Sequence, residues 1–399
     1  MTEPISPNIK RFLTDEALPT GKGSHVLALG EGHGTISQKQ YLTKHINELI
    51  SEHNVGVLGE ELAPFMTVFM WAYRDGKLKP PEGVTDRAYL QAMLKAYLEP
   101  PYAKAAESSV DLTTTAVDVG IEVIGCDAGI SLEQHEAKYS SEIAECRKKR
   151  SEDEDTRRNW FELNYVDKRR NHVASSNAYA FMLCEVQDLL KDNPEYKTRL
   201  KNIEAVIEAQ HEWNRTHLLN KIDTDSVSAA ILKSVIPDDK NGLVIYGLSH
   251  LMGIEQRDIS TRGTFAQALE RLGLKTTTAL SGNSNELRSV LGDINCTIME
   301  QLQKQKHPFH LPGLLVTDSD QVIDPQSTKL ESVEEDSLEA FLLRMREDYP
   351  KSLANKSFPT QQNRQIVEKS CRILQDESFV TALEKVRADY VGNEPKTQI

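Results

Sequence analysis

Short aliphatic runs that are apolar at consecutive positions constrain the fold of this chain more than any other feature. Four of them end in glycine with a charged residue or histidine within the next three positions, and a fifth follows later; they cover residues 25–30, 55–59, 121–125, 242–247 and 276–280. Stretches with helical spacing of apolar residues separate these runs. A strand that is apolar on both sides must be covered on both sides. The sequence therefore predicts an α/β fold, with a mostly parallel sheet and helices on both faces.

The gaps between the runs predict the domain organisation. Helices are expected at residues 38–51, 66–73, 86–97 and 264–272, with chain breaks at Pro80-Pro81 and Pro100-Pro101. A long charged helical insertion is expected at about residues 130–225. The catalytic core is predicted to span residues 1–290, and residues 291–399 to form a C-terminal extension. This extension is expected to hold a hairpin (313–317 with 321–323) and helices at 339–346, 362–374 and 379–388.

Composition narrows the classes of partner. The 399 residues carry a net charge of −13, which disfavours nucleic acid and anionic membrane surfaces as partners. Five cysteines without a CxxC pair indicate free thiols rather than disulfides or a thiolate zinc site. The sequence shows neither a Sec signal peptide nor a transmembrane segment, so the protein is expected to be cytoplasmic where it is made. Export as an effector without a cleavable signal would leave no such mark.

Polar residues follow the ends of the four main runs. Glu31 and His33 follow the first, Glu60 and Glu61 the second, Asp127 the third and His250 the fourth. Because the carboxyl ends of parallel strands meet at one edge of a sheet, these residues are expected to share one site.

These residue types suit acid–base chemistry. Crowded carboxyl groups raise one another's pKa, so that one of them can hold a proton near neutral pH. A neighbouring histidine can act as a base, an acid or a metal ligand. Four of the residues, Glu31, His33, Glu60 and His250, could also bind a divalent metal ion, although a reaction without a cofactor is equally open. The glycines around Glu31 do not form a phosphate-binding loop, because no Gly-Lys-Ser/Thr follows them.

The order of five motifs resembles a known superfamily. The motifs are Gly30-Glu31-Gly32-His33-Gly34, Glu60-Glu61-Leu62, Gly125-Cys126-Asp127, Arg170-Asn171 and Gly247-Leu248-Ser249-His250. The pattern is similar to that of the erythromycin esterase-like, ChaN-like and Tiki-like proteins, which include Ras-cleaving toxin domains and bacterial effectors. The resemblance covers about residues 24–285. It implies an α/β fold with a polar cluster at the strand ends and chemistry that differs between members: ester hydrolysis, peptide cleavage with or without a metal ion, or haem binding.

The favoured function is therefore a hydrolase, either a peptidase or an esterase, acting on a protein or a small ester. His250 or Glu60 is expected to be the base that activates water, while Glu31 and His33 position the water or polarise the carbonyl group. Arg170 would stabilise negative charge or form a structural ion pair, and Glu61, Asp127 and Asn171 would line the site. Surface positions are expected for His45 and His53. The alternatives are a haem- or metal-binding protein and a catalytically dead scaffold that binds partners.

Overall fold

Seven strands form one sheet in the part of the chain that the computed structural model describes. The described residues are 18, 23, 25–31, 35–129, 131–151, 154–162, 174–217, 222–247, 250–251, 264–281, 314–316, 322–323 and 371–391. The strands are β1 (His25–Glu31), β2 (Val55–Glu60), β3 (Glu122–Gly125), β4 (Asn241–Gly247), β5 (Lys275–Ser281), β6 (Leu314–Val316) and β7 (Val322–Ile323). Their order is β3–β2–β4–β1–β5–β6–β7, and every neighbouring pair is parallel except β6 and β7. The predicted α/β fold with a mostly parallel sheet is confirmed.

The register of the central strands aligns their carboxyl ends. Glu31, the last residue of β1, pairs with Gly247, the last residue of β4. Glu60, the last residue of β2, pairs with Ile245 of β4 and with Gly125 of β3. One edge of the sheet therefore receives the residues that follow four strands.

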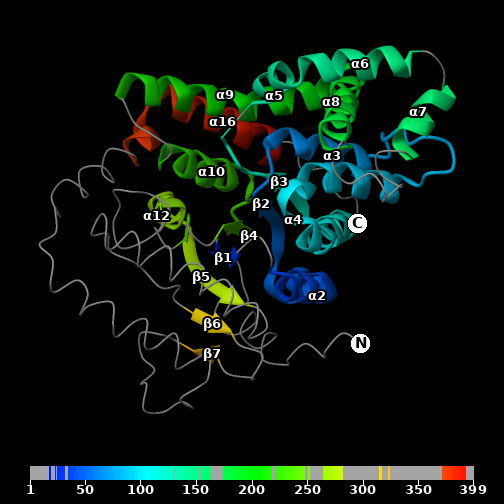
Figure 1. Cartoon of the computed structure of the whole chain (residues 1–399). Helices are drawn as coiled ribbons and strands as arrows, with labels where there is room; N and C mark the ends of the chain where they lie inside the picture. Colours follow the sequence, from blue (N-terminus) through cyan, green and yellow to red (C-terminus); the bar gives the residue numbers. More distant parts are fainter. Residues whose placement is uncertain are drawn as a thin grey trace, which may run out of the picture.

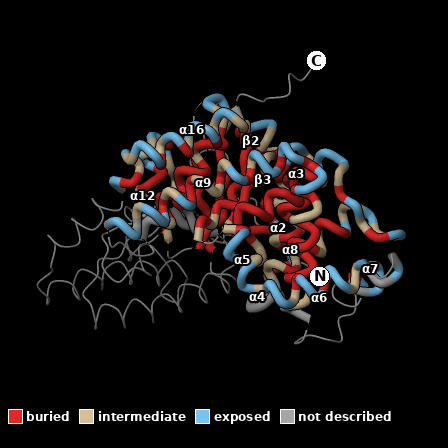
Figure 2. The backbone as a smooth tube through the Cα atoms, turned by 90° about the horizontal axis from the view of Figure 1, so that it is seen from above, coloured by how far each residue is buried: buried red, intermediate tan, exposed pale blue. Residues whose placement is uncertain are grey.

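Helices cover both faces of this sheet (Figure 1). On one face lie α2 (Ser37–His53) and α4 (Asp86–Asp118), and on the other lie α10 (Ile222–Val235) and α12 (Thr264–Arg271). The ring of Tyr246 on β4 stacks on Phe265 of α12 at 4.4 Å between ring centroids. All seven residues of β4 are buried, as expected for a strand between two helical layers. Figure 2 shows the buried residues gathered along the middle of the molecule, with exposed positions on the outer turns of the helices.

The helix α4 runs through Pro100 and Pro101 and then doubles back. Gln91 and Asp111 would lie about 30 Å apart on a straight helix, but the Gln91 side chain donates a hydrogen bond to Asp111 at 3.4 Å. The expected helix at 86–97 is therefore only the first arm of α4. Its second arm, which the sequence analysis did not predict, returns along the sheet and contributes to the candidate site.

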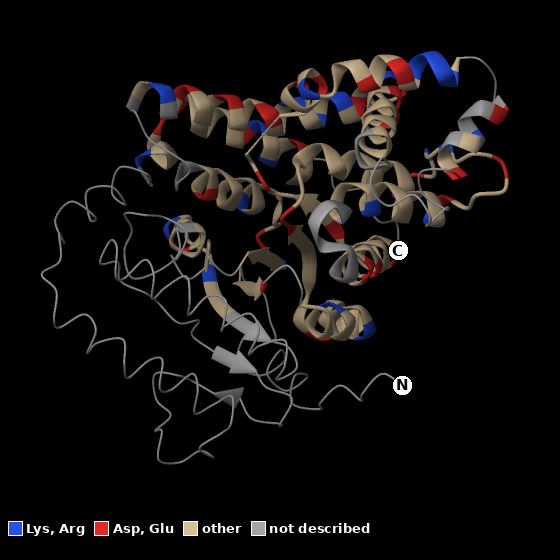
Figure 3. Ribbon diagram, viewed as in Figure 1, with Lys and Arg blue, Asp and Glu red and all other residues tan. Residues whose placement is uncertain are grey.

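The predicted insertion is helical throughout its described residues. It contains α5 (Leu132–Lys138), α6 (Ser140–Arg150), α7 (Glu154–Phe161), α8 (Ala174–Asp192) and α9 (Pro194–His217). The short helices η2 (Pro64–Met66) and α3 (Thr67–Arg74) follow β2 and pack beside them. Figure 3 shows that many of the charged residues lie on these outer helices, whereas the ribbon of the central sheet is mostly uncharged. No helix among the described residues combines the length and apolar character needed to cross a membrane.

The described parts of the C-terminal extension belong to the same body. The predicted hairpin is present as the antiparallel pair β6–β7, while residues 318–320 between them lie outside the described part. The predicted helix at 379–388 is α16 (Glu377–Val391), which follows the turn η5 (Cys371–Gln375) and packs against α9 and α10. Phe379 and Val386 of α16 are completely buried in the core shared with the sheet. The predicted helix at 339–346 and residues 362–370 lie outside the described residues.

An arginine joins α16 to the insertion and to the helix after β2. The guanidinium group of Arg199 on α9 lies 4.1 Å from the ring centre of Trp71 and 4.5 Å from that of Tyr390. Arg199 also forms an ion pair with Glu122 of β3 at 3.3 Å. The two rings also lie near each other, with 6.2 Å between their centroids, and this cluster of a cation and two aromatic rings fixes the C-terminal helix against the body.

We expect Gly125→Ala to destabilise the fold strongly. A Cβ atom at Gly125 would lie 2.4 Å from the carbonyl oxygen of Ala63 and 2.7 Å from that of Leu62, and backbone cannot move away as a side chain can. The expected loss is about 3 kcal/mol of unfolding free energy, measured by urea denaturation. Gly56→Ala is the matched control, since the three atoms nearest to its Cβ would all belong to the side chain of Lys240 rather than to backbone. Equal stability of the two variants would contradict this packing.

Candidate functional site

Two glutamates and a lysine meet at the end of the sheet on the side of α2 and α4. Glu31 ends β1 and Glu60 ends β2, and both side chains are buried. Lys39 of α2 forms an ion pair with Glu31 and donates a hydrogen bond to Ser109 Oγ of α4 at 2.7 Å. A lysine so deeply buried (4% exposed) is uncommon unless a carboxylate compensates its charge.

The hydroxyl group of Thr113 holds Glu60 from the second arm of α4. Thr113 Oγ1 lies 2.7 Å from both carboxyl oxygens of Glu60 and 2.9 Å from the carbonyl oxygen of Ser109. A hydroxyl group has a single proton to donate. When that proton is donated to Ser109, Thr113 accepts a hydrogen bond from Glu60, which requires the protonated carboxyl group.

Burial raises the pKa of Glu60 to about 7, because the ionised carboxyl group loses its hydration. The hydrogen bond from Thr113 and the charge of Lys39 oppose this shift, and the charge of Glu31 adds to it. The carboxyl group of Glu60 is therefore poised to gain or lose a proton near neutral pH.

Glu61 lies beside Glu60 but is held by a different strand. Its Oε2 accepts a hydrogen bond from the backbone N–H of Gly247 at 2.7 Å. Burial raises the pKa of Glu61 to about 7; the charge of His250 and the bond from Gly247 oppose the shift, while Asp127 and Glu31 favour it. The site thus contains two carboxyl groups that titrate near neutrality.

His250 follows β4 and is oriented by an aspartate of α10. Its Nδ1 lies 2.8 Å from Oδ1 of Asp225, whose side chain is only 1% exposed. A Cβ atom built on Gly247 would lie 3.2 Å from Cδ2 of His250 and 3.1 Å from Oε2 of Glu61. The absence of a side chain at Gly247 therefore lets His250 and Glu61 approach each other.

The remaining strand end places Asp127 next to this pair. The backbone N–H of Asp127 donates to the carbonyl oxygen of Leu62 at 3.0 Å, which ties the residue after β3 to the turn after β2. Its Oδ1 accepts a hydrogen bond from the N–H of Gly129 at 3.2 Å. The charges of Asp127 and Glu61 both raise the pKa of Tyr97, after the larger effect of burial, so Tyr97 also borders the site.

A small cavity connects the carboxyl groups. It measures about 30 Å³ and is lined by Glu31, Lys39, Glu60, Glu61, Leu62, Leu98, Ser109 and Ile245. This space is sufficient for one or two water molecules. The arrangement can therefore hold water between groups that carry and exchange protons.

Five of the eight residues expected in the site are described, and the structure brings them together. Glu31, Glu60, Glu61, Asp127 and His250 lie at one edge of the sheet, and the charges of Glu31, Asp127 and His250 all act on Glu61. Three residues, His33, Arg170 and Asn171, lie outside the described residues. Among the residues that are described, no group of three or more His, Cys, Asp or Glu side chains is arranged to hold a metal ion.

Two histidines and a tyrosine have mainly structural surroundings. The expectation that His53 lies on the surface is wrong: it is fully buried, and its Nδ1 bonds the carbonyl oxygen of Leu18 at 2.6 Å. It sits at the end of α2, where the chain turns into β2. His45 is half-buried, bonds Glu48 at 3.1 Å and contacts the ring of Tyr41. Tyr246 is buried, and its hydroxyl group bonds Ser228 at 3.3 Å.

Four residues of the site were missed by sequence analysis: Lys39, Ser109, Thr113 and Asp225. Each lies on a helix, 8 to 16 residues from the nearest strand in sequence, where a lone polar residue is usually solvated. The sequence carries only a weak indication that these four residues are buried in the site. The second arm of α4 carries Thr113 and Thr114 beside apolar residues, and α10 carries Asp225 and Ser226 just before the apolar run 229–232; all four are buried.

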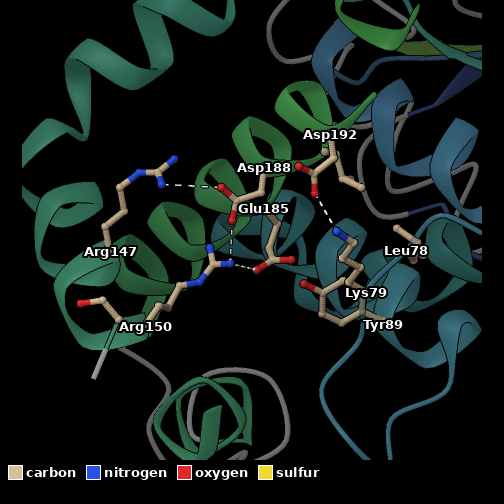
Figure 4. Close-up of a pocket in the computed structure, with 10 residues that line it drawn as sticks. Leu78, Lys79, Tyr89, Arg147, Arg150, Glu185, Asp188 and Asp192 are labelled. Atoms are coloured by element: carbon tan, nitrogen blue, oxygen red, sulfur yellow. Dashed lines mark hydrogen bonds and ion pairs between the residues drawn. The ribbon is translucent and has the colours of Figure 1, made fainter. Parts of the chain in front are cut away.

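A larger cavity lies away from the strand ends, between α6, α8 and the segment before α4. It measures about 360 Å³ and is lined mostly by charged residues (Figure 4). Its basic groups already bond its acidic groups: Arg150 bonds Glu185 and Asp188 at 2.8 Å, and Lys79 bonds Asp192 at 2.7 Å. This network joins α6 to α8 and contains no histidine, so we place the candidate site at the strand ends.

Comparison of the chain with protein-family models, curated proteins and solved structures gives no match. The function is therefore argued from the chemistry and geometry of the site.

We expect stability to fall between about pH 4.5 and pH 7 because of Glu60. Its ordinary pKa is 4.5 and burial raises the pKa to about 7, so the folded state keeps a proton that the unfolded chain releases in this range. Below pH 4.5 both states are protonated, and above pH 7 the folded state carries the full cost of a buried charge. The free energy of unfolding of Glu60→Gln minus that of the wild type should therefore be roughly 2–4 kcal/mol larger at pH 8 than at pH 4.

The measurement is urea unfolding of both proteins across this pH range. Glu52→Gln, an exposed position on α2, is the control and should follow the wild type at every pH. A constant difference between Glu60→Gln and the wild type at all pH values would show that Glu60 is not protonated in this window.

Proposed function

We propose that the chain is a hydrolase, a peptidase or an esterase, in which His250 activates water at the carboxyl ends of the parallel strands. The observation that carries the proposal is the array Asp225–His250–Glu61. It combines an oriented histidine, bonded at 2.8 Å to a buried aspartate, with a carboxyl group whose pKa is raised to about 7. Paired groups of this kind can serve as base and acid in one reaction.

Asp225 fixes the role of the imidazole ring. A neutral histidine that donates from Nδ1 to a carboxylate has its lone pair on Nε2. In the proposed reaction, Nε2 takes a proton from water while the water oxygen forms a bond to the carbonyl carbon of the substrate. Asp225 stabilises the positive charge that then develops on the ring.

Glu61 completes the proton balance. The bond from the carbonyl carbon to the leaving oxygen or nitrogen breaks, and the leaving group takes a proton from the Glu61 carboxyl group. His250 then transfers the proton from water to the Glu61 carboxylate, which restores both groups.

The same chemistry is implied by the resemblance to the erythromycin esterase-like, ChaN-like and Tiki-like proteins. Peptide and ester bonds both present a carbonyl group that water can attack, so the proposed residues suit either substrate. The described residues of the insertion border the site near Tyr97, where its ring stacks with Tyr179 of α8. We therefore propose that the insertion helps to select the substrate.

We expect His250→Ala to lower hydrolysis by at least about 100-fold, the usual contribution of a general base. Wild type and variant are incubated with a cell lysate, followed by mapping of new peptide termini, and in parallel with a chromogenic acyl ester. His211→Ala is the control, because His211 is exposed on α9 far along the chain from the strand ends. Asp225→Asn should show a similar loss with an unchanged KM.

The variants are compared by thermal unfolding, so that loss of activity is read only from folded protein. Termini that depend on His250 identify a peptidase, and ester cleavage that depends on it identifies an esterase. If neither product depends on His250 in folded protein, the proposed hydrolase function is rejected.

A further inference from the structure

Lys39 supplies a positive charge in the middle of the acidic residues of the site. Its side chain, on the first turn of α2, is 5% exposed. The ammonium group pairs with Glu31, bonds Ser109 at 2.7 Å and acts electrostatically on Glu60. Burying an ammonium group is costly, and the bonds to Glu31 and Ser109 offset that cost.

We infer that the ammonium group of Lys39 is the cation of this site and takes the place that a divalent metal ion would otherwise hold between Glu31 and Glu60. The inference rests on the proposed function and deepens it, since it states how a hydrolytic site rich in carboxyl groups is neutralised. Lys39 acts here as a positioning residue that keeps the carboxyl groups together.

The size of the cavity favours the lysine over a metal ion. The space beside Lys39, Glu31 and Glu60 measures about 30 Å³. An ion such as Mg²⁺ usually keeps several of its waters, whereas this space is sufficient for only one or two water molecules. A hydrated ion therefore does not fit while the ammonium group is present, and the two positive charges would repel each other.

The donor atoms are also engaged within the protein. Both oxygens of Glu60 lie within 2.7 Å of the Thr113 hydroxyl group, and Oε2 of Glu61 accepts from Gly247. Of the four expected metal ligands, the two carboxyl groups Glu31 and Glu60 thus already have a charge or hydrogen-bond partner within the chain, and His33 lies outside the described residues.

The experiment measures binding of Mn²⁺, a cation that favours carboxylate ligands, to the full chain by isothermal titration. We expect wild type not to bind Mn²⁺ at this site. Lys39→Met should gain a Mn²⁺ site at least about 10-fold tighter than any binding by wild type, because two carboxyl groups lose their cation. The double variant Lys39→Met/Glu31→Gln should lose that gain.

Lys44→Met is the matched control, since Lys44 is exposed on the same helix. It should behave as the wild type. If Lys39→Met does not fold alone, Mn²⁺ should restore its thermal transition and Lys39→Arg should fold without metal. The inference is overturned if wild type binds Mn²⁺ and Glu31→Gln abolishes that binding. It is overturned equally if Lys39→Met neither gains Mn²⁺ nor is restored by it.

This test does not use turnover, so its outcome is separate from that of the proposed function. A protein that shows the expected Mn²⁺ behaviour but no hydrolysis dependent on His250 would retain the assignment of Lys39 and lose the hydrolase proposal. Hydrolysis that depends on His250 and also requires bound Mn²⁺ in wild type would retain the hydrolase proposal and reject the assignment of Lys39.

Discussion

Burying Glu31 and Glu60 beside the half-buried Glu61 at one edge of a sheet is the constraint on which the rest of this structure depends. Parallel pairing aligns the ends of β1, β2 and β4, so the side chains of Glu31, Glu60 and Glu61 converge. Ionised carboxyl groups cannot remain together in an apolar interior without compensation. The surrounding elements provide it in three forms: a lysine, hydrogen-bond donors, and retained protons.

The two helical layers divide this compensation between them. On one face, α2 contributes Lys39 and the returning arm of α4 contributes Ser109 and Thr113. On the other face, α10 contributes Asp225, which acts through His250. Glu61 lies between these groups, and both Glu31 and His250 affect its pKa. The proposed proton exchange requires this position, since it brings a base and an acid together across the sheet edge.

The sequence was sufficient to predict the sheet and the residues at its edge, because both follow from local patterns. Aliphatic runs predicted β1 to β5 to within a residue or two, and the polar residue after each main run indicated Glu31, Glu60, Asp127 and His250. The residues that support them could not be predicted in this way. Thr113 reaches Glu60 only because α4 reverses direction near Pro100. In the sequence alone, Lys39 looks like any exposed lysine of a helix, and only the packing of α2 beside the end of β1 buries it. Such contacts depend on tertiary packing, which has no local pattern.

The packing of α16 has a consequence for the order in which this protein can assemble during synthesis. The helix α10, which carries Asp225, lies against α16, and α16 completes the core with Phe379 and Val386. A chain growing from the ribosome therefore exposes the apolar side of α10 until more than a hundred further residues have been made. The histidine and its aspartate can be held firmly only after that point. A nascent chain that has not yet reached α16 would carry the strand-end residues and still lack the helix that packs against α10, which delays the proposed activity until residues 377–391 have been made.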